Sequence, residues 1–202
     1  SLFVNLDPKV SDLPLPGITT QETDELEFGG RIKFTKSGSD IGVYAAHLLP
    51  NNPVLNLVTA KAEANPYTLI GSSMNRTFGK MLLKADIAYK QGLETIEAGV
   101  ITGPVSIDRL DYALGIEYGF SDGKQLVVAL NNKQTLNFRG SYLVLPGFSG
   151  SPAIVAKEHA SQLMLSFSDT YLNENLSLDV GGLASLDAEM LMLFSQLDYS
   201  FS

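Results

Sequence analysis

Residues 109–132 read RLDYALGIEYGFSDGKQLVVALNN, and this stretch decides the fold class. Every even position from Leu110 to Phe120 is apolar, whereas the odd positions between them are acidic or small. A side-chain period of two is the pattern of a β-strand with one face in an apolar medium and the other in a polar one. Turn residues follow at 121–124, and the alternation resumes through Leu126, Val128 and Leu130. The stretch therefore predicts a β-hairpin.

Two aromatic residues, Tyr118 and Phe120, stand at the end of this apolar face, just before the turn. Membrane β-barrels carry girdles of aromatic residues at the two edges of the bilayer, and a water-soluble sandwich has no such need. The hairpin therefore favours a transmembrane β-barrel over a soluble sheet protein.

The composition sets limits on the class of protein. The chain has 202 residues, of which 45% are hydrophobic, and its mean hydropathy is +0.09. No run of about 18 apolar residues is present, so we expect no membrane-spanning helix. Cysteine is absent, which excludes disulfides and thiolate metal sites, and the net charge of −8 argues against a nucleic-acid partner. We expect neither a cofactor nor a metal, and no covalent chemistry.

The same alternation predicts nine strands. They follow an expected external loop at 1–25, which is interrupted by prolines and glycine. The chain is expected to be a single β-barrel region over 1–202, with the strands and their loops at 26–201. The expected strands are 26–35, 41–49, 67–78, 81–91, 109–120, 125–131, 162–171, 175–185 and 189–201.

The connections between these strands differ in length. Those after the first, third, fifth and seventh strands are short, and those after the second, fourth and sixth are long. The connection after the eighth strand is the one short exception. Short turns at one end and long loops at the other are typical of an outer-membrane barrel with periplasmic turns and external loops.

The odd number of strands points to an incomplete barrel. Single-chain bacterial barrels have even numbers of strands, and an open nine-stranded sheet would leave two unpaired edges in lipid. The chain also begins at Ser1 without Met. We therefore expect it to be a segment of a larger barrel.

If the apolar faces point to lipid, the polar faces line a lumen. Cations dominate the first and fourth strands and acids the fifth, eighth and ninth, which predicts a transverse field that orients dipolar solutes. The competing interpretation is that these charges pair across strands and fill the interior. The predicted lumen-lining residues are Glu27, Arg31, Lys33, Lys84, Asp86, Lys90, Asp111, Glu117, Asp179, Gln196 and Asp198. The longest loop is most apolar around Val144, Leu145 and Phe148, and we expect this part to narrow the pore.

Four motifs resemble a known family: EFGGRIKF at 27–34, GSDIGVY at 38–44, IGSS at 70–73 and LKADIAY at 83–89. They are similar to a family of large, porin-like outer-membrane proteins of Gram-negative bacteria, long catalogued as a domain of unknown function. The resemblance extends from 26 to the end of the chain. It implies an outer-membrane location and a role in transport, including that of hydrophobic molecules or lipids. By analogy with porin-like proteins, further partners would be a second copy of the chain or a periplasmic transport protein.

Two other classes of function stay open. A soluble β-sandwich binding module also has alternating strands and hairpins. A hydrolase carried on a barrel would need a histidine beside a serine and an acid, and His47 lies on a predicted strand. The function that the sequence favours is the passage of small solutes or hydrophobic compounds across the outer membrane, with membrane lipid around the barrel.

Overall fold

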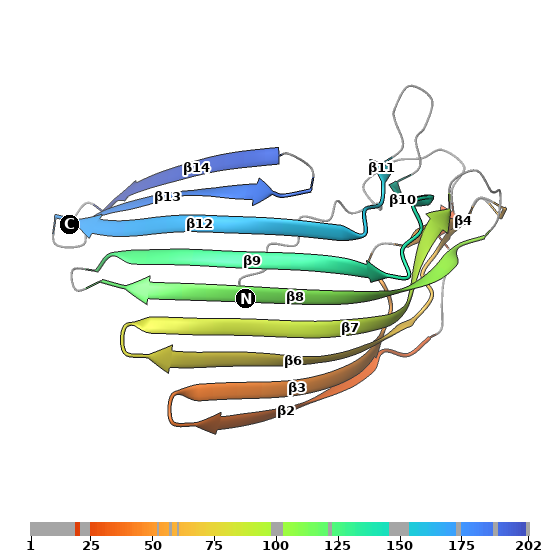
Figure 1. The fold of residues 1–202 in the computed structure, drawn as a ribbon, viewed down its shortest axis with the longest axis horizontal. Helices are drawn as coiled ribbons and strands as arrows, with labels where there is room; N and C mark the ends of the chain where they lie inside the picture. The colour runs from red at the N-terminus through yellow and green to blue at the C-terminus, as the bar shows by residue number, and fades with distance from the viewer. Residues whose placement is uncertain are drawn as a thin grey trace.

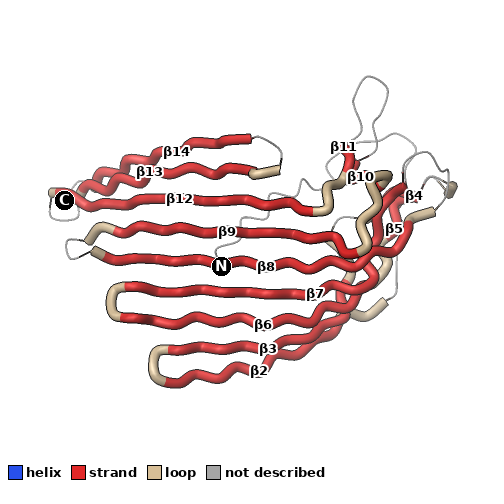
Figure 2. The backbone as a smooth tube through the Cα atoms, viewed as in Figure 1, coloured by secondary structure: helices blue, strands red, loops and turns tan. Residues whose placement is uncertain are grey.

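A computed structural model describes residues 19–20, 25–51, 53–56, 58–59, 61–97, 103–120, 123–145, 154–172, 175–187 and 190–200. Within these ranges the chain forms strands and turns without any helix, so no helix there could cross a membrane (Figures 1 and 2). Nine long strands make up one antiparallel sheet. They are β2 (Phe28–Lys36), β3 (Ser39–Leu48), β6 (Tyr67–Phe78), β7 (Met81–Glu97), β8 (Val105–Gly119), β9 (Gln125–Leu136), β12 (His159–Tyr171), β13 (Leu176–Ser185) and β14 (Met190–Tyr199).

The nine strands follow one another in space as they do in the sequence. Their order across the sheet is β2-β3-β6-β7-β8-β9-β12-β13-β14, and each pairs antiparallel with its neighbours. This up-and-down arrangement confirms the nine predicted strands and the all-β antiparallel class. The bounds of β6 are as predicted, and most other bounds differ by one to five residues.

Five short strands lie in segments that the sequence analysis assigned to loops. They are β1 (Thr19–Thr20), β4 (Val54–Asn56), β5 (Lys61–Glu63), β10 (Tyr142–Leu145) and β11 (Ile154–Val155). The first three form a small separate sheet, whereas β10 pairs with β11 and with the end of β7. These segments have two to four residues each, too few for a period of two to stand out.

The predicted end of β7 and the predicted beginning of β8 were wrong, since β7 continues to Glu97 and β8 already begins at Val105. The pairing of β7 with β8 shifts register between Lys90 and Leu93, where Gly92 adopts a φ of +82°. This bulge changes the phase of the alternation, so the pattern breaks although the hydrogen-bonded ladder continues.

The short connections lie at one end of the sheet, which we call the turn end. They join β2 to β3, β6 to β7, β8 to β9 and β12 to β13 (Figure 2). The turn between β2 and β3 has two residues, Ser37 with φ 47° and Gly38 with φ 74°, as a type I′ turn requires. Longer connections lie at the opposite end, which we call the loop end, together with the short connection between β13 and β14.

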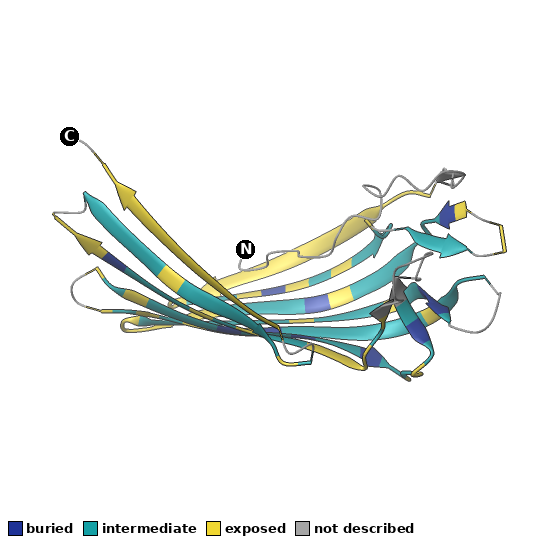
Figure 3. Ribbon diagram, turned by 90° about the horizontal axis from the view of Figure 1, so that it is seen from above, coloured by how far each residue is buried: buried dark blue, intermediate teal, exposed yellow. Residues whose placement is uncertain are grey.

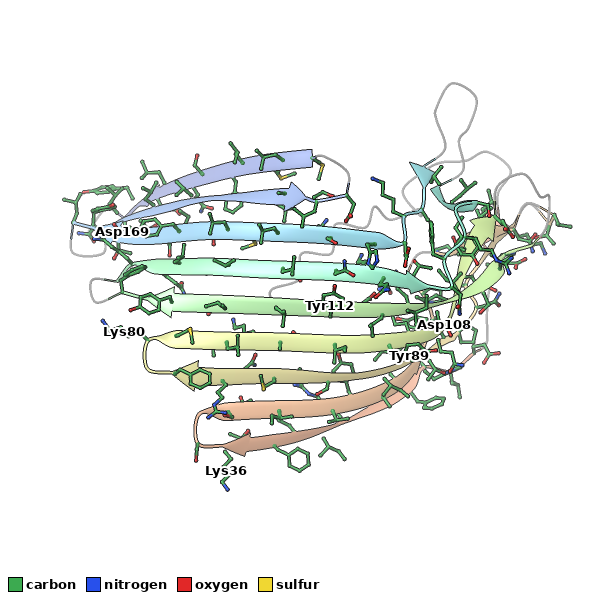
Figure 4. All side chains as sticks on the ribbon, in the orientation of Figure 1. Lys36, Lys80, Tyr89, Asp108, Tyr112 and Asp169 are labelled. Carbon is green, nitrogen blue, oxygen red and sulfur yellow. The ribbon has the colours of Figure 1, made fainter. Side chains whose placement is uncertain are left out.

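The sheet bends into a shallow trough, so it has a convex and a concave face (Figure 3). The convex face is toward the viewer in Figure 4, and Tyr112, which belongs to the apolar set of β8, lies on this face. Little of the chain is buried: among the described residues the buried hydrophobic side chains are Ala62, Ile96, Ala113, Ala129 and Tyr142.

The sheet is not closed. Both β2 and β14 pair along one edge only, with β3 and β13, so the described strands do not form a closed barrel, and the larger barrel predicted from the sequence stays a prediction. They also do not form a two-layered sandwich, because the long strands belong to a single sheet and the second sheet has only the three short strands β1, β5 and β4.

Candidate functional site: the concave face of the sheet

The register of the strands places the polar positions on the concave face. Residues directly opposite one another in an antiparallel sheet point to the same side. One continuous row runs across eight strands, from Lys33 to Ser185. Its members are Lys33, Gly42, Ser73, Asp86, Ala113, Asn131, Gln162 and Ser185.

Two glycines let long side chains lie flat on this face. A Cβ at Gly42 would lie 2.9 Å from both Nε and Nη2 of Arg31, so the guanidinium covers that glycine. A Cβ at Gly71 would lie 2.5 Å from Cζ of Tyr44, so the tyrosine ring covers the second one. The side chains thereby lie along the wall of the trough, where a solute can reach them.

A hollow of about 510 Å³ opens on the concave face between β2 and β9. Small residues, Ala113, Gly115 and Ala129, form part of its lining. Its polar lining comes from Arg31, Tyr44, Ser73, Asn75, Lys84, Asp86 and Asn131. It therefore offers hydrogen-bonding groups of both kinds and both signs of charge.

The charges of β7 and β8 pair with each other. Lys84 forms an ion pair with Glu117, and Lys90 Nζ lies 2.7 Å from Asp111 Oδ2. Arg109 makes a two-point contact with the same Asp111, at 2.7 Å from Nε to Oδ1 and 3.0 Å from Nη2 to Oδ2. Bidentate contacts between arginine and carboxylate are among the stronger ionic hydrogen bonds.

This pairing follows the competing interpretation of the lumen charges, that cations and acids meet across strands. Lys33 likewise pairs with Asp40 at 3.0 Å on the adjacent strand. The predicted basic and acidic strands, the fourth and fifth, are direct neighbours as β7 and β8, so their charges largely cancel. Arg31 and Asp86 are different, because neither forms an ion pair with another described residue. The positive charge of Arg31 is near enough to attract the negative charge of Asp86.

The other half of the concave face has a different chemistry. Neither β12, β13 nor β14 contains a lysine or arginine. Asp179 lies opposite Gln196, and the Gln196 amide donates to Asp198 at 2.8 Å. Beside these polar residues the register places an apolar patch, which the sequence analysis missed. We call it the apolar patch, and its members are Met164, Leu183, Met190, Met192 and Phe194.

A period of two predicts the convex leucines of β14 but not the apolar residues between them. The signal was present in the sequence MLMLF at 190–194, which is apolar at every residue and not only at alternate ones.

Glu27 and the predicted constriction lie at the loop end. The Glu27 carboxylate accepts a hydrogen bond of 2.8 Å from the backbone N–H of Leu49, so it binds the end of β3. Val144 and Leu145 belong to β10, whose residues Tyr142 and Leu143 pair with Glu97 and Ile96 of β7. Phe148 lies outside the described residues.

His47 lies on the convex face, away from the hollow. Its ring stacks on Phe28, with 5.3 Å between ring centroids. No serine or carboxylate hydrogen-bonds to its side chain within the described part of the chain, so its surroundings do not resemble those of a catalytic histidine. In the same part of the chain, no cluster of three or more His, Asp or Glu residues could hold a metal ion.

Comparison with known proteins returns no family. No family model matches the sequence, and no curated protein matches it either.

Proposed function

We propose that this chain is part of an outer-membrane β-barrel that passes small solutes along its concave face, without covalent chemistry. The observation that carries the proposal is the convex face, which is apolar and uncovered. Ile32 is 64% exposed, Leu114 51% and Leu193 75%, and these residues belong to strands at both edges and the middle of the sheet. Soluble monomers rarely expose contiguous apolar patches larger than a few hundred Å². Lipid is the medium in which such a face is stable.

The apolar band crosses the sheet diagonally. On β2 it spans Phe28–Phe34, and its centre at Arg31 is level with Asp111 of β8. On β14 it spans Leu191–Tyr199, and its centre at Ser195 is level with Tyr118 of β8. Projected onto β8, the centre of the band is at Asp111 for the β2 edge and at Tyr118 for the β14 edge. The centre is thus displaced by seven residues over eight strand-to-strand steps.

This displacement gives an angle. Seven residues correspond to about 24 Å along the strands and eight steps to about 38 Å across them, so the strands would tilt by about 32° from the membrane normal. Strands of outer-membrane barrels tilt by about 35–45°. Nothing in a water-soluble environment favours a diagonal apolar band. In a planar bilayer, by contrast, the lipid-facing residues of neighbouring tilted strands must follow such a diagonal.

Aromatic residues border the band, as they do in membrane barrels. At the turn end they occur on β2, β6, β8, β12 and β14, and at the loop end Tyr89 donates to Asp108 at 2.7 Å (Figure 4). Lys36, the last residue of β2, and Lys80, in the turn between β6 and β7, lie beyond the band at the turn end (Figure 4). The turn-end set is Phe34, Phe78, Tyr118, Phe120, Tyr171 and Tyr199.

The open edges fit the same proposal. In lipid, unpaired backbone groups cost several kcal/mol each, so both β2 and β14 must pair with further strands of a larger barrel or with each other. The resemblance to large porin-like proteins agrees with the first arrangement.

A second candidate cargo is a hydrophobic compound. The apolar patch on β12–β14 favours it, because Met192 and Phe194 face the trough and are 49% and 42% exposed. In a water-filled pore that passes only polar solutes, such exposed apolar side chains would be unfavourable.

The test begins with the intact protein extracted from cells and run on a gel with and without boiling. We expect membrane fractionation, detergent-dependent solubility and faster migration of the unboiled sample, followed by solute uptake in liposomes that contain the purified protein. Recovery in the soluble fraction, with no effect of heat on migration, would refute the barrel.

A further inference from the structure

We propose that the hollow on the concave face binds a small zwitterion, such as an amino acid, with the carboxylate of the solute on Arg31 and its ammonium group on Asp86. The proposal rests on the proposed function, since it names the class of solute that the passage favours. It is carried by two opposite charges that lie close together and do not pair.

Arg31 is held in place but keeps most of its hydrogen-bonding capacity. Its guanidinium lies over Gly42, and Nη2 donates to Ser73 Oγ at 3.1 Å. A guanidinium has five N–H donors, and no described carboxylate forms an ion pair with this one. The remaining donors are available to the carboxylate of a solute.

Asp86 provides the complementary charge. It lies directly opposite Ser73 on the neighbouring strand, which places their Cβ atoms about 5 Å apart. Ser73 thus contacts Arg31 on one side and neighbours Asp86 on the other. No described residue makes a hydrogen bond or an ion pair with the Asp86 carboxylate, although Arg31 is close enough to act on its charge.

The surrounding charges do not compete for the solute. Lys84, which also lines the hollow, pairs with Glu117, and Lys90 pairs with Asp111. Arg31 and Asp86 are therefore the two charges of the described hollow that have no ionic partner.

The class of solute follows from this arrangement. A simple anion would be attracted by Arg31 and repelled by Asp86, and a simple cation would meet the reverse. A neutral polyol would leave both charges without a partner. A zwitterion satisfies both at once through charge-assisted hydrogen bonds, which are about twice as strong as neutral ones. Tyr44, Asn75 and Asn131 add neutral hydrogen-bonding groups around it.

The experiment compares the uptake of serine with that of glycerol, a small neutral polyol, in liposomes containing the intact protein. The variants are Asp86→Asn and Arg31→Gln. Glu158→Gln serves as the control, because it removes one negative charge from the loop segment before β12 and not from the hollow. We expect the ratio of serine uptake to glycerol uptake to fall at least threefold in both hollow variants and to stay unchanged in the control.

A third variant separates the charge pair from the fold. In the exchange Arg31→Asp with Asp86→Arg, both charges are present in reversed positions, and a zwitterion can bind in the opposite orientation. We expect it to recover part of the serine preference that the single variants lose. An unchanged ratio in Asp86→Asn, with glycerol still passing, would overturn the zwitterion site alone. Liposomes that no solute enters would instead refute the proposed passage itself.

Discussion

The diagonal course of the apolar band leads to a quantitative prediction about two leucines. Leu114 of β8 and Leu163 of β12 lie in the same row of the sheet, through Leu130 of β9 between them. Their exposures are similar, 51% and 39%. A band perpendicular to the strands would place both at the same depth in the bilayer. In the proposed membrane orientation, the diagonal band places them at different depths.

The magnitude follows from the positions of the two leucines in the sheet. Leu114 is at the centre of the band on β8, which runs from Leu110 to Tyr118, and Leu163 lies in the same row two strand-to-strand steps away on β12. Two steps span about 10 Å across the strands, and a tilt of about 32° turns this into about 5 Å along the membrane normal, nearly halfway from the midplane to the edge of an apolar band about 25 Å tall. An arginine costs about 2–4 kcal/mol at the midplane and about 0–1 kcal/mol near the interface.

We therefore expect Leu114→Arg to lower the free energy of unfolding by about 2–4 kcal/mol and Leu163→Arg to lower it by about 1 kcal/mol less than that. The assay is reversible unfolding by guanidinium in phospholipid vesicles, followed by the gel mobility of unboiled samples. Leu114→Ala and Leu163→Ala correct for the loss of the leucine side chains. Equal costs for the two arginine variants would refute the diagonal band, and near-zero costs for both would refute its contact with lipid.

Two further predictions concern the concave face. Asp111→Ala leaves Lys90 and Arg109 without their carboxylate, and we expect it to lower the free energy of unfolding by about 1–3 kcal/mol, less in 1 M salt; a loss independent of salt would contradict the ionic origin. Gly71→Ala forces the Tyr44 ring off the wall, and we expect a cost of about 1–3 kcal/mol in the same unfolding assay. Combining it with Tyr44→Ala should cost less than the sum of the two single changes, whereas simple additivity would show that the ring and the glycine are not coupled.

The sequence predicted the long strands well because alternation between the two faces is visible in each of them, most regularly on β8 and β12. The set Leu110, Leu114 and Tyr118 on β8 and the set Leu163, Leu165 and Phe167 on β12 are regular enough to specify both the strand and its face. Arg76 interrupts the apolar face of β6. Its guanidinium carbon lies 4.6 Å from the centre of the Phe78 ring, so the side chain packs on an aromatic neighbour within that face.

What the sequence could not supply was the register between strands. Each predicted lumen charge could be assigned to a face from its own strand. Whether Lys84 has Glu117 as an ionic partner, however, depends on the register between β7 and β8. The hollow was out of reach for the same reason, because Arg31 and Asp86 are 55 positions apart in the sequence and come together only through β3 and β6. The short strand β10 was missed because it is held by the end of β7 and not by a pattern of its own.

The concave face divides into two parts, and the division bears on what could pass along it. From β2 to β9 the wall carries paired charges around the Arg31–Asp86 hollow, whereas β12 to β14 carry the apolar patch and no lysine or arginine. In β14 the apolar residues continue on both faces, with Leu193 at 75% exposure on the convex side and Phe194 at 42% on the concave side. A strand that borders only water on its inner face gains nothing from Met192 and Phe194, because exposed apolar surface is unfavourable there. Within a completed barrel, β14 therefore faces either a hydrophobic cargo or apolar side chains from the strands beyond it. The two alternatives make different demands: a cargo site must stay open to the lumen, whereas internal packing must cover these side chains.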